Sequence, residues 1–169
     1  MQYIVVFILS LLISTSSYAD EEYKLKAGDS ISIHVYGEDD LDLITKLDES
    51  GLIRYPFIGE VNVLDKSVRQ VANLIVKGLQ DGYFVDPDVH VSIVEYRPFY
   101  IHGQVKKPGA FPYRPNITVS MGIALAGGLT ERASSNWILQ KSGTEQEIKV
   151  DGDQLIFPGD ILIIKQSFF

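Results

Sequence analysis

The chain lacks cysteine altogether and has few basic residues. None of its 169 residues is a cysteine, which excludes disulfide bonds, thiolate metal sites and cysteine nucleophiles. It also excludes the acylated N-terminal cysteine of a bacterial lipoprotein. The 15 Lys and Arg residues stand against 22 Asp and Glu, a formal net charge of −7 with no basic cluster. Because binding to a phosphate backbone needs clustered positive charge, nucleic acid is not an expected partner.

Apolar runs long enough to span a membrane are absent as well. The run from Tyr3 to Ile13 has the length of the apolar core of a signal peptide and is too short to cross a bilayer. Small residues at Ser17 and Ala19 predict cleavage before Asp20, so residues 1–19 are expected to be a signal peptide. An uncleaved anchor is the alternative. The rest of the chain is expected to be exported, soluble and globular.

Motifs for catalysis and cofactor binding are also missing. The three histidines, His34, His90 and His102, are not spaced as a metal pair, and neither a Gly-x-Ser-x-Gly elbow nor a phosphate-binding loop occurs. We therefore expect no catalytic residue, no cofactor, no metal site and no enzymatic activity. Carboxylate pairs for glycoside hydrolysis are defined by distance in space, so a hydrolase stays as an alternative.

Alternation of apolar and polar residues predicts the strands of the first half. In residues 30–35, every second residue is Ile or Val, which is typical of a half-buried strand. Residues 47–65 indicate short strands joined by tight turns, and residues 89–93 alternate again. Asp39, Asp40 and Asp42, which lie between these segments, are expected to form a solvated loop.

One clear helix is predicted within residues 65–82. Its apolar residues recur at helical spacing along one face. Ser67 and Gln70 form a capping-box pattern at its start, and Gly82 suits the position just after its end.

A hairpin opens the second half, which begins near Arg97. Two predicted strands flank the turn Lys106-Lys107-Pro108-Gly109, in which Pro108 pre-sets φ and Gly109 can take a positive φ.

A short helix and further strands follow this hairpin. The helix lies within residues 116–130, is capped by Thr118 or Ser120, and stops at Gly127-Gly128. Strands and helices in this order, without a βαβ repeat, predict an α+β fold. No low-complexity linker separates the halves, so we expect the two units to be docked.

A Gly-Asp turn followed by a strand occurs twice. Gly28-Asp29 precedes the first strand, and Gly159-Asp160 precedes the last. Glycine supplies a permissive backbone, and aspartate can bind the amides of the turn. Because such turns are common, the repeat could be a coincidence. Alternatively, the two strands hold equivalent places in their sheets, and the first strand packs onto the second unit.

Aromatic and lysine residues around the central hairpin are the candidate contacts. Tyr100, Tyr113 and Trp137 could stack on sugar rings or contact another subunit, although strand aromatics usually pack in the core. Lys106 and Lys107 could bind an acidic chain or a neighbouring subunit, or could form a solvated turn.

Several of these segments together resemble a known family. "YKLKAGDSISIHVYG", "LDESGLIRYPFIGEVNV", the helix and "VDPDVHVSIVEY" are similar, in this order, to the polysaccharide biosynthesis/export domain of bacterial outer-membrane export proteins. "YIHGQVKKPGAFPY" through "SMGIALAGGLTERAS" resembles the soluble-ligand-binding β-grasp (SLBB) domain that follows it in that family, and "FPGDILII" resembles the closing strand. The resemblance implies an export domain over residues 20–96 and an SLBB domain over residues 97–169.

The resemblance also implies a function. Members form homo-oligomeric rings that give a capsular or exopolysaccharide chain a route across the periplasm and outer membrane, beside an inner-membrane co-polymerase. Two departures are the missing cysteine and the ending "KQSFF" in place of an amphipathic helix. We therefore expect a periplasmic conduit that relies on a separate outer-membrane protein. The alternative is a monomeric periplasmic module that binds a saccharide or another soluble ligand.

Overall fold

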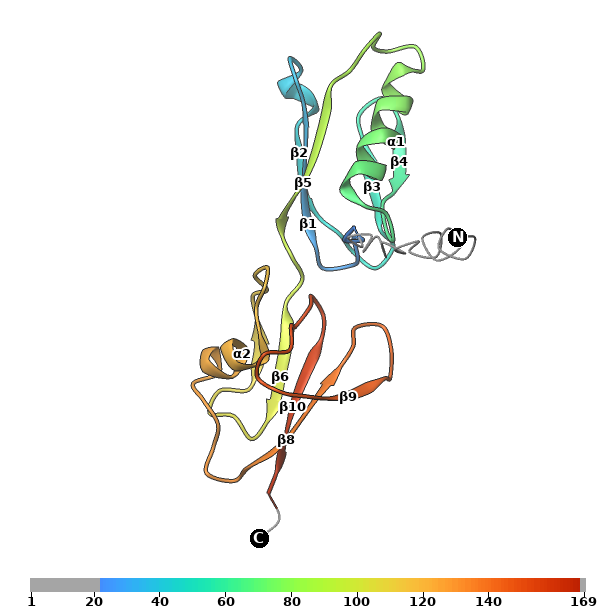
Figure 1. The fold of residues 1–169 in the computed structure, drawn as a ribbon. Coiled ribbons are helices and arrows are strands. Elements are labelled where there is room, and N and C mark those ends of the chain that lie inside the picture. The colour runs from blue at the N-terminus through green and yellow to red at the C-terminus, as the bar shows by residue number, and fades with distance from the viewer. Residues whose placement is uncertain (1–21, 168–169) are drawn as a thin grey trace, which may run out of the picture.

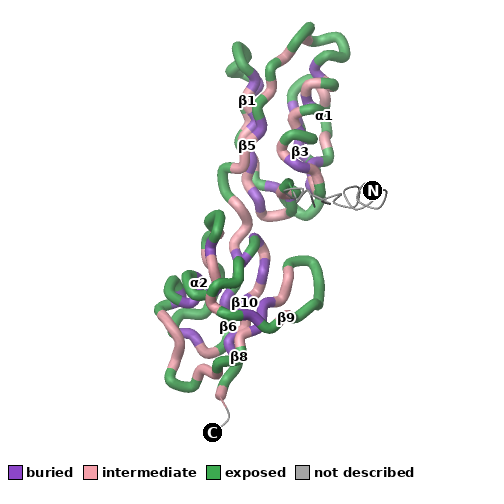
Figure 2. Tube along the Cα trace, in the orientation of Figure 1, coloured by how far each residue is buried: buried purple, intermediate pink, exposed green. Residues whose placement is uncertain are grey.

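The structure, a computed structural model, describes residues 22–167. The chain forms two units placed end to end and joined by the segment 96–98 (Figure 1). Buried residues gather in two separate groups, one inside each unit (Figure 2). The predicted signal peptide lies outside the described residues. Within residues 22–167, no helix is both long enough and apolar enough to cross a membrane.

The first unit is built on a three-stranded sheet. Its central strand β1 (Ser30–Val35) pairs antiparallel with β2 (Leu43–Lys46) on one side and β5 (Val89–Glu95) on the other. Alternate residues of β1 are buried, which confirms the predicted strand.

Strand β2 is a feature that the sequence did not predict. Asp39, Asp40 and Asp42 are exposed, as predicted, but Asp39–Leu41 forms a 3₁₀ helix (η1) and Leu41 is buried. Asp42 then leads into β2, and its carboxylate is hydrogen-bonded to His34 Nδ1 at 2.7 Å. The acidic segment therefore turns the chain back onto β1.

A hairpin and the predicted helix complete the first unit. β3 (Leu52–Tyr55) and β4 (Gly59–Asn62) form a separate two-stranded sheet. The helix α1 (Val68–Gln80) packs on β5 and on this hairpin. Gly78 permits the close approach, because a Cβ there would lie 2.6 Å from Ile58 Cγ2.

The capping box of α1 is confirmed. The hydroxyl of Ser67 accepts the Gln70 N–H at 3.2 Å, and Gln70 Oε1 accepts the Ser67 N–H at 2.9 Å. Just after the helix, Gly82 has φ +91°. The buried face of α1 carries Val71, Ile75 and Leu79.

The second unit is a five-stranded mixed sheet with one helix. Its order is β7-β6-β10-β8-β9, and the central β10 is parallel to β6 and antiparallel to β8. The short helix α2 (Val119–Leu125) begins at the Thr118 cap, one of the two predicted caps. The strands are β6 (Phe99–Gly103), β7 (Gly109–Phe111), β8 (Ala133–Gln140), β9 (Glu147–Val150) and β10 (Ile161–Gln166).

The hairpin predicted at the start of this unit is confirmed by the pairing of β6 with β7. Its loop, residues 104–108, is held by main-chain hydrogen bonds to residues 126–128 at the end of α2. At the base of the loop, Gly103 lies so close to β10 that a Cβ there would come 2.1 Å from the Ile164 oxygen.

Three sheets and two α-helices in this order within residues 22–167 confirm the α+β fold class. One detail of the prediction is corrected. The strand after Gly28-Asp29 does not pack onto the second unit, since β1 pairs with β2 and β5. The turn before β1 and the preceding Tyr23 contact the segment that leads to the second unit.

Candidate functional site at the junction of the two units

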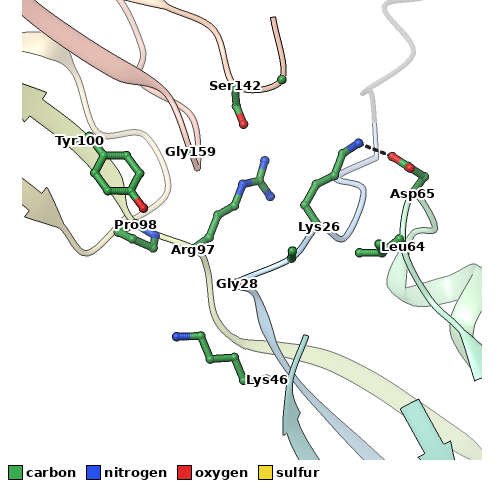
Figure 3. A pocket seen from close by; sticks show the side chains of 12 residues that line it. Lys26, Gly28, Lys46, Leu64, Asp65, Arg97, Pro98, Tyr100, Ser142 and Gly159 are labelled. Carbon is green, nitrogen blue, oxygen red and sulfur yellow. Dashed lines mark ion pairs between the residues drawn. The ribbon is translucent and has the colours of Figure 1, made fainter. Parts of the chain in front are cut away.

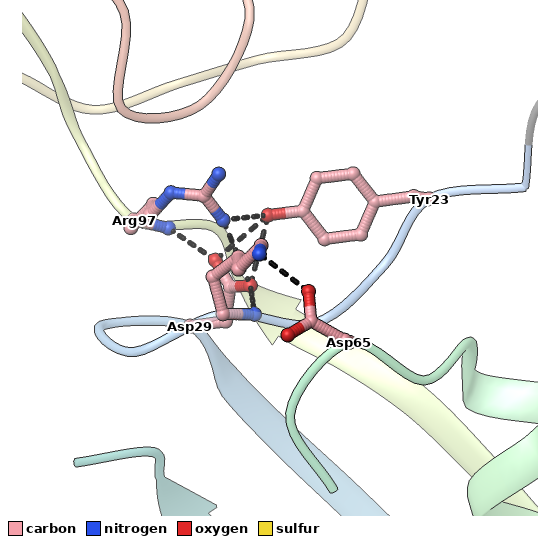
Figure 4. Close-up of polar contacts among 5 residues, drawn as sticks. Tyr23, Asp29, Asp65 and Arg97 are labelled. Carbon is pink, nitrogen blue, oxygen red and sulfur yellow. Dashed lines mark hydrogen bonds and ion pairs between the residues drawn. The ribbon is translucent and has the colours of Figure 1, made fainter. Parts of the chain in front are cut away.

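The carboxylate of Asp29 organises the turn that enters β1. It is fully buried and accepts the main-chain N–H groups of Lys26 and Arg97, each at 2.8 Å. The Tyr23 hydroxyl donates to it at 2.8 Å and Arg97 Nη1 at 3.3 Å (Figure 4). A buried carboxylate is tolerated only when it is paired and hydrogen-bonded. The turn and Arg97 therefore fix each other.

Tyr23 begins a row of three tyrosines that runs from the first unit to the second. Its ring centroid lies 5.0 Å from that of Tyr96, which lies 5.2 Å from that of Tyr113, both edge to face. Burial raises the pKa of Tyr23 well above its ordinary value, and the hydrogen bond to Asp29 raises it further. Burial also raises the pKa of Tyr113. Tyr23 thus stays a hydrogen-bond donor over the physiological pH range.

The second Gly-Asp turn repeats the hydrogen bonds of the first. Asp160 is buried and accepts the N–H groups of Phe157 and Ser142, each at 3.0 Å, and Lys141 Nζ at 3.0 Å. In both turns the carboxylate binds the N–H three residues before it, an N–H just after a neighbouring strand, and a cation. The strands that follow are the central strands of their sheets. The two turns therefore hold equivalent places.

Arg97 lies between these two turns. A Cβ on Gly28 would come 3.1 Å from Arg97 Cβ, and a Cβ on Gly159 would come 2.7 Å from Arg97 Nε. Both glycines have positive φ, +94° and +83°. Glycine is required at both positions, for its backbone angle and for the space that Arg97 occupies.

Two hollows open on the two sides of Arg97, with volumes of about 710 and 700 Å³. We call the first the cationic cleft (Figure 3) and the second the aromatic cleft. Arg97 and Ser142 line both. The cationic cleft is also lined by Lys26, Ala27, Gly28, Lys46, Leu64, Asp65, Pro98, Tyr100, Gly143 and Gly159. The aromatic cleft is also lined by Glu22, Tyr23, Lys24, Tyr96, Tyr113, Pro115, Lys141, Phe157, Pro158 and Asp160.

The electrostatics of the cationic cleft are set by three basic side chains and one exposed acid. Asp65 is ion-paired with Lys26 at the rim. The hydrogen bond and charge of Lys26, followed by the charges of Lys24 and Lys66, lower the pKa of Asp65. No group of three or more His, Asp or Glu side chains within residues 22–167 is arranged to hold a metal ion.

Tyr100 and Tyr113, two of the five candidate contacts, lie at this junction. Tyr100 lines the cationic cleft and Tyr113 the aromatic cleft. The turn residues Gly28, Asp29, Gly159 and Asp160 form the frame of the site.

Lys106, Lys107 and Trp137, the other three candidate contacts, line neither cleft. The two lysines are exposed, and their N–H groups donate to the Gly128 and Ala126 oxygens. Trp137 packs against the second core, and its Nε1 donates to the Ser134 oxygen at 3.1 Å.

The remaining predicted turn residues also lie in the second unit. Pro108 ends the β6–β7 loop and Gly109 begins β7, while Gly127 and Gly128 follow α2 with φ +80° and +92°. They shape the loop around the two lysines and do not reach the junction.

Comparison with known families agrees with the arrangement of two units. Residues 17–94 match the polysaccharide biosynthesis/export protein family, and residues 98–149 match the SLBB domain. The chain therefore carries a polysaccharide biosynthesis/export domain followed by an SLBB domain. In this export protein the two matches meet at the segment 95–97, where Arg97 is fixed.

Two curated relatives illustrate the similarity. The exopolysaccharide production protein ExoF of Rhizobium meliloti (strain 1021) is 38% identical over 82 residues, 47% of this chain and 20% of ExoF. The polysialic acid transport protein KpsD of Escherichia coli is 26% identical over 128 residues, 75% of this chain and 20% of KpsD. The export protein thus spans 20% of the length of each of these relatives.

Sequence reasoning missed the residues that build the junction of the export protein. Arg97 was noted only as a boundary, and Tyr23, Lys26 and Lys46 were not selected. The repeated Gly-Asp turn was the one available signal, because a buried aspartate in a turn requires donors from elsewhere in the chain.

Proposed function

We propose that this export protein forms a homo-oligomeric ring in the periplasm and gives a capsular or exopolysaccharide chain a route toward the outer membrane. The match to the export family and the names of the relatives support this role. In this proposal residues 1–19 direct export, residues 20–96 and 97–169 are the two domains, and no reaction is catalysed. An inner-membrane co-polymerase supplies the polysaccharide, and a separate outer-membrane protein completes the path.

The observation that carries the proposal is the fixed junction at Arg97. A ring closes only if every copy presents the same two surfaces at the same angle. Arg97 is bound to Asp29 through its main chain and its guanidinium, and it lies against Gly28 and Gly159. Rotation of one unit against the other would drive Gly159 against the Arg97 side chain, which its hydrogen bonds to Asp29 hold in place. This favours subunits of uniform shape over a flexible pair of modules.

The outer face of the first sheet is our candidate for subunit contact. Strand β2 is an edge strand, so its backbone can pair with another copy. Ile44 on β2 is 71% exposed, and Val94 on β5 is 57% exposed. Lys106, Lys107 and Trp137 stay candidates for contact with a neighbouring subunit or the co-polymerase, and Tyr100 and Tyr113 for contact with the glycan.

Light scattering and electron microscopy of the purified protein test this assembly. We expect particles of several subunits for the wild type and for Val85→Asp, a matched control at a loop residue that is 99% exposed. Ile44→Asp should shift the mass toward the monomer. In cells, deletion of the gene should reduce surface polysaccharide, and the wild-type gene should restore it. A protein that stays monomeric, together with unchanged surface polysaccharide, would overturn the proposal.

A monomeric saccharide-binding module is the second candidate, and the two clefts favour it. This function predicts saccharide binding at all protein concentrations with no change in mass. It also predicts that Ile44→Asp leaves the protein fully active. The light-scattering series therefore separates the two functions.

A further inference from the structure

Positive charge is concentrated in the cationic cleft, although the chain as a whole carries −7. Lys26, Lys46 and Arg97 reach it from three segments that are distant in sequence (Figure 3). Among the described residues, Asp65 is the one acidic residue in its lining, and it is already paired with Lys26. An anion in this cleft would therefore meet Lys46, which forms no ion pair with the described residues, and Arg97, which is paired with Asp29 through Nη1 alone.

The guanidinium of Arg97 is held in place but only partly used. Nη1 donates to the Tyr23 hydroxyl at 2.7 Å and to Asp29 at 3.3 Å. Nε and Nη2 donate to no group among the described residues. Since no buried side-chain nitrogen or oxygen in residues 22–167 lacks a partner, both nitrogens are reached by solvent. Two adjacent N–H donors on a fixed guanidinium match the two oxygens of a carboxylate.

Hydroxyl groups and aromatic rings surround this guanidinium. Ser142 lines both clefts, and Figure 3 shows its hydroxyl directed toward Arg97. The Tyr100 ring, 43% exposed, forms one wall of the cationic cleft. On the other side of Arg97, Phe157 is 47% exposed and Lys141 Nζ lies 4.6 Å from its ring centroid. Hydroxyl donors and aromatic faces beside a cation suit a polar ring that carries a negative charge.

We propose that the cationic cleft binds the carboxylate of an acidic sugar residue. Arg97 Nε and Nη2 take the two carboxylate oxygens, Lys46 adds positive charge, and the Ser142 hydroxyl binds a sugar hydroxyl. The choice of a sugar as the ligand rests on the proposed export role, whereas the anion site rests on the cleft alone. The hydrogen bonds at the junction then also preorganise Arg97 Nε and Nη2 for binding the carboxylate.

Titration calorimetry on protein purified after expression of the full chain tests the site. The probes are trigalacturonic acid, the neutral maltotriose and inorganic phosphate. We expect trigalacturonic acid to bind, with an affinity that falls as salt rises, and maltotriose not to bind. Lys46→Gln should weaken binding about tenfold, the size of one hydrogen bond to a charged group. Lys149→Gln is the matched control, because it removes the same charge at an exposed residue outside both clefts, and it should bind like the wild type.

Three outcomes would overturn the site. Maltotriose could bind as tightly as trigalacturonic acid, phosphate could bind as tightly as trigalacturonic acid, or Lys46→Gln and Lys149→Gln could bind alike. Surface polysaccharide in the deletion strain separates this result from the proposed function. Loss of polysaccharide in a strain whose wild-type protein binds no acidic sugar would leave the export role and remove the site. Binding of trigalacturonic acid, together with unchanged surface polysaccharide in the deletion strain, would support the site and remove the export role.

Discussion

Replacing Asp29 by Asn should destabilise the first unit far more than the same change at Asp65. Each oxygen of the Asp29 carboxylate accepts at least one N–H, from Lys26 or Arg97. An Asn amide would therefore turn its NH₂ toward a donor, whichever way it is placed, and would leave the guanidinium without its counter-charge. Removing one partner of a buried ion pair costs about 3–5 kcal/mol. Because solvent reaches part of Arg97, we expect a loss of about 3 kcal/mol in the free energy of unfolding.

Asp65→Asn is the matched control for this change. The Asp65 side chain is 66% exposed and pairs with Lys26 at the surface. Exposed ion pairs contribute about 0–1 kcal/mol, so this variant should unfold nearly like the wild type.

Urea unfolding followed by two probes measures the difference. Far-UV circular dichroism reports both units, whereas the fluorescence of Trp137, the one tryptophan of the chain, reports the second unit. With an m-value of about 2 kcal/mol per M, the expected loss lowers the midpoint of Asp29→Asn by about 1.5 M. The circular dichroism midpoint should fall more than the fluorescence midpoint. Equal midpoints for Asp29→Asn and Asp65→Asn would refute the role of the buried carboxylate.

Three further predictions concern turns, caps and pH. Gly159→Ala should lower the melting temperature more than Gly143→Ala. Both glycines have positive φ (+83° and +74°), but only the new Cβ at residue 159 meets neighbouring atoms. Equal shifts in melting temperature would mean that backbone strain alone causes the destabilisation. Ser67→Ala should cost about 1 kcal/mol of stability by urea unfolding, as expected for the loss of a cap, and an unchanged midpoint would contradict the capping box. Burial, aided by the Asp42 charge, raises the pKa of Tyr55 to about 12, and the pKa of Tyr23 is raised as well. Unfolded tyrosines ionise near pH 10, so their contribution to stability is complete below pH 10 and is lost as the pH rises toward 12; a flat urea midpoint across this range would contradict the raised values.

Local patterns were sufficient for much of the fold. The alternation of residues 30–35 predicts β1 because every second side chain must face the same side of a strand. The pair Ser67 and Gln70 predicts the start of α1 because the two residues satisfy each other's main-chain donors. The exposure of Asp39, Asp40 and Asp42 was predicted from their charge, whereas the burial of Leu41 among them is set by the core around it.

The candidate site depended on contacts that no local pattern contains. Arg97 meets Asp29 from 68 residues away, and Lys46 reaches the same cleft from an edge strand. Tyr100 and Tyr113 were selected for their aromatic character and lie at the junction, whereas the equally aromatic Trp137 packs against the second core. The sequence determines which side chains could bind a ligand, but the packing of the two units determines which of them share a cleft.

The position of β10 has a consequence for the order in which the protein assembles. The first sheet is complete once the chain has reached Glu95, so that unit can fold as soon as its own residues have been synthesised. In the second sheet, the central strand is also the last of the five to emerge, and β6 and β8 have no shared neighbour until Ile161–Gln166 arrives. Until β10 pairs with them, β6 and β8 each keep one unpaired edge. The second unit is therefore most exposed to proteolysis and aggregation before β10 is in place.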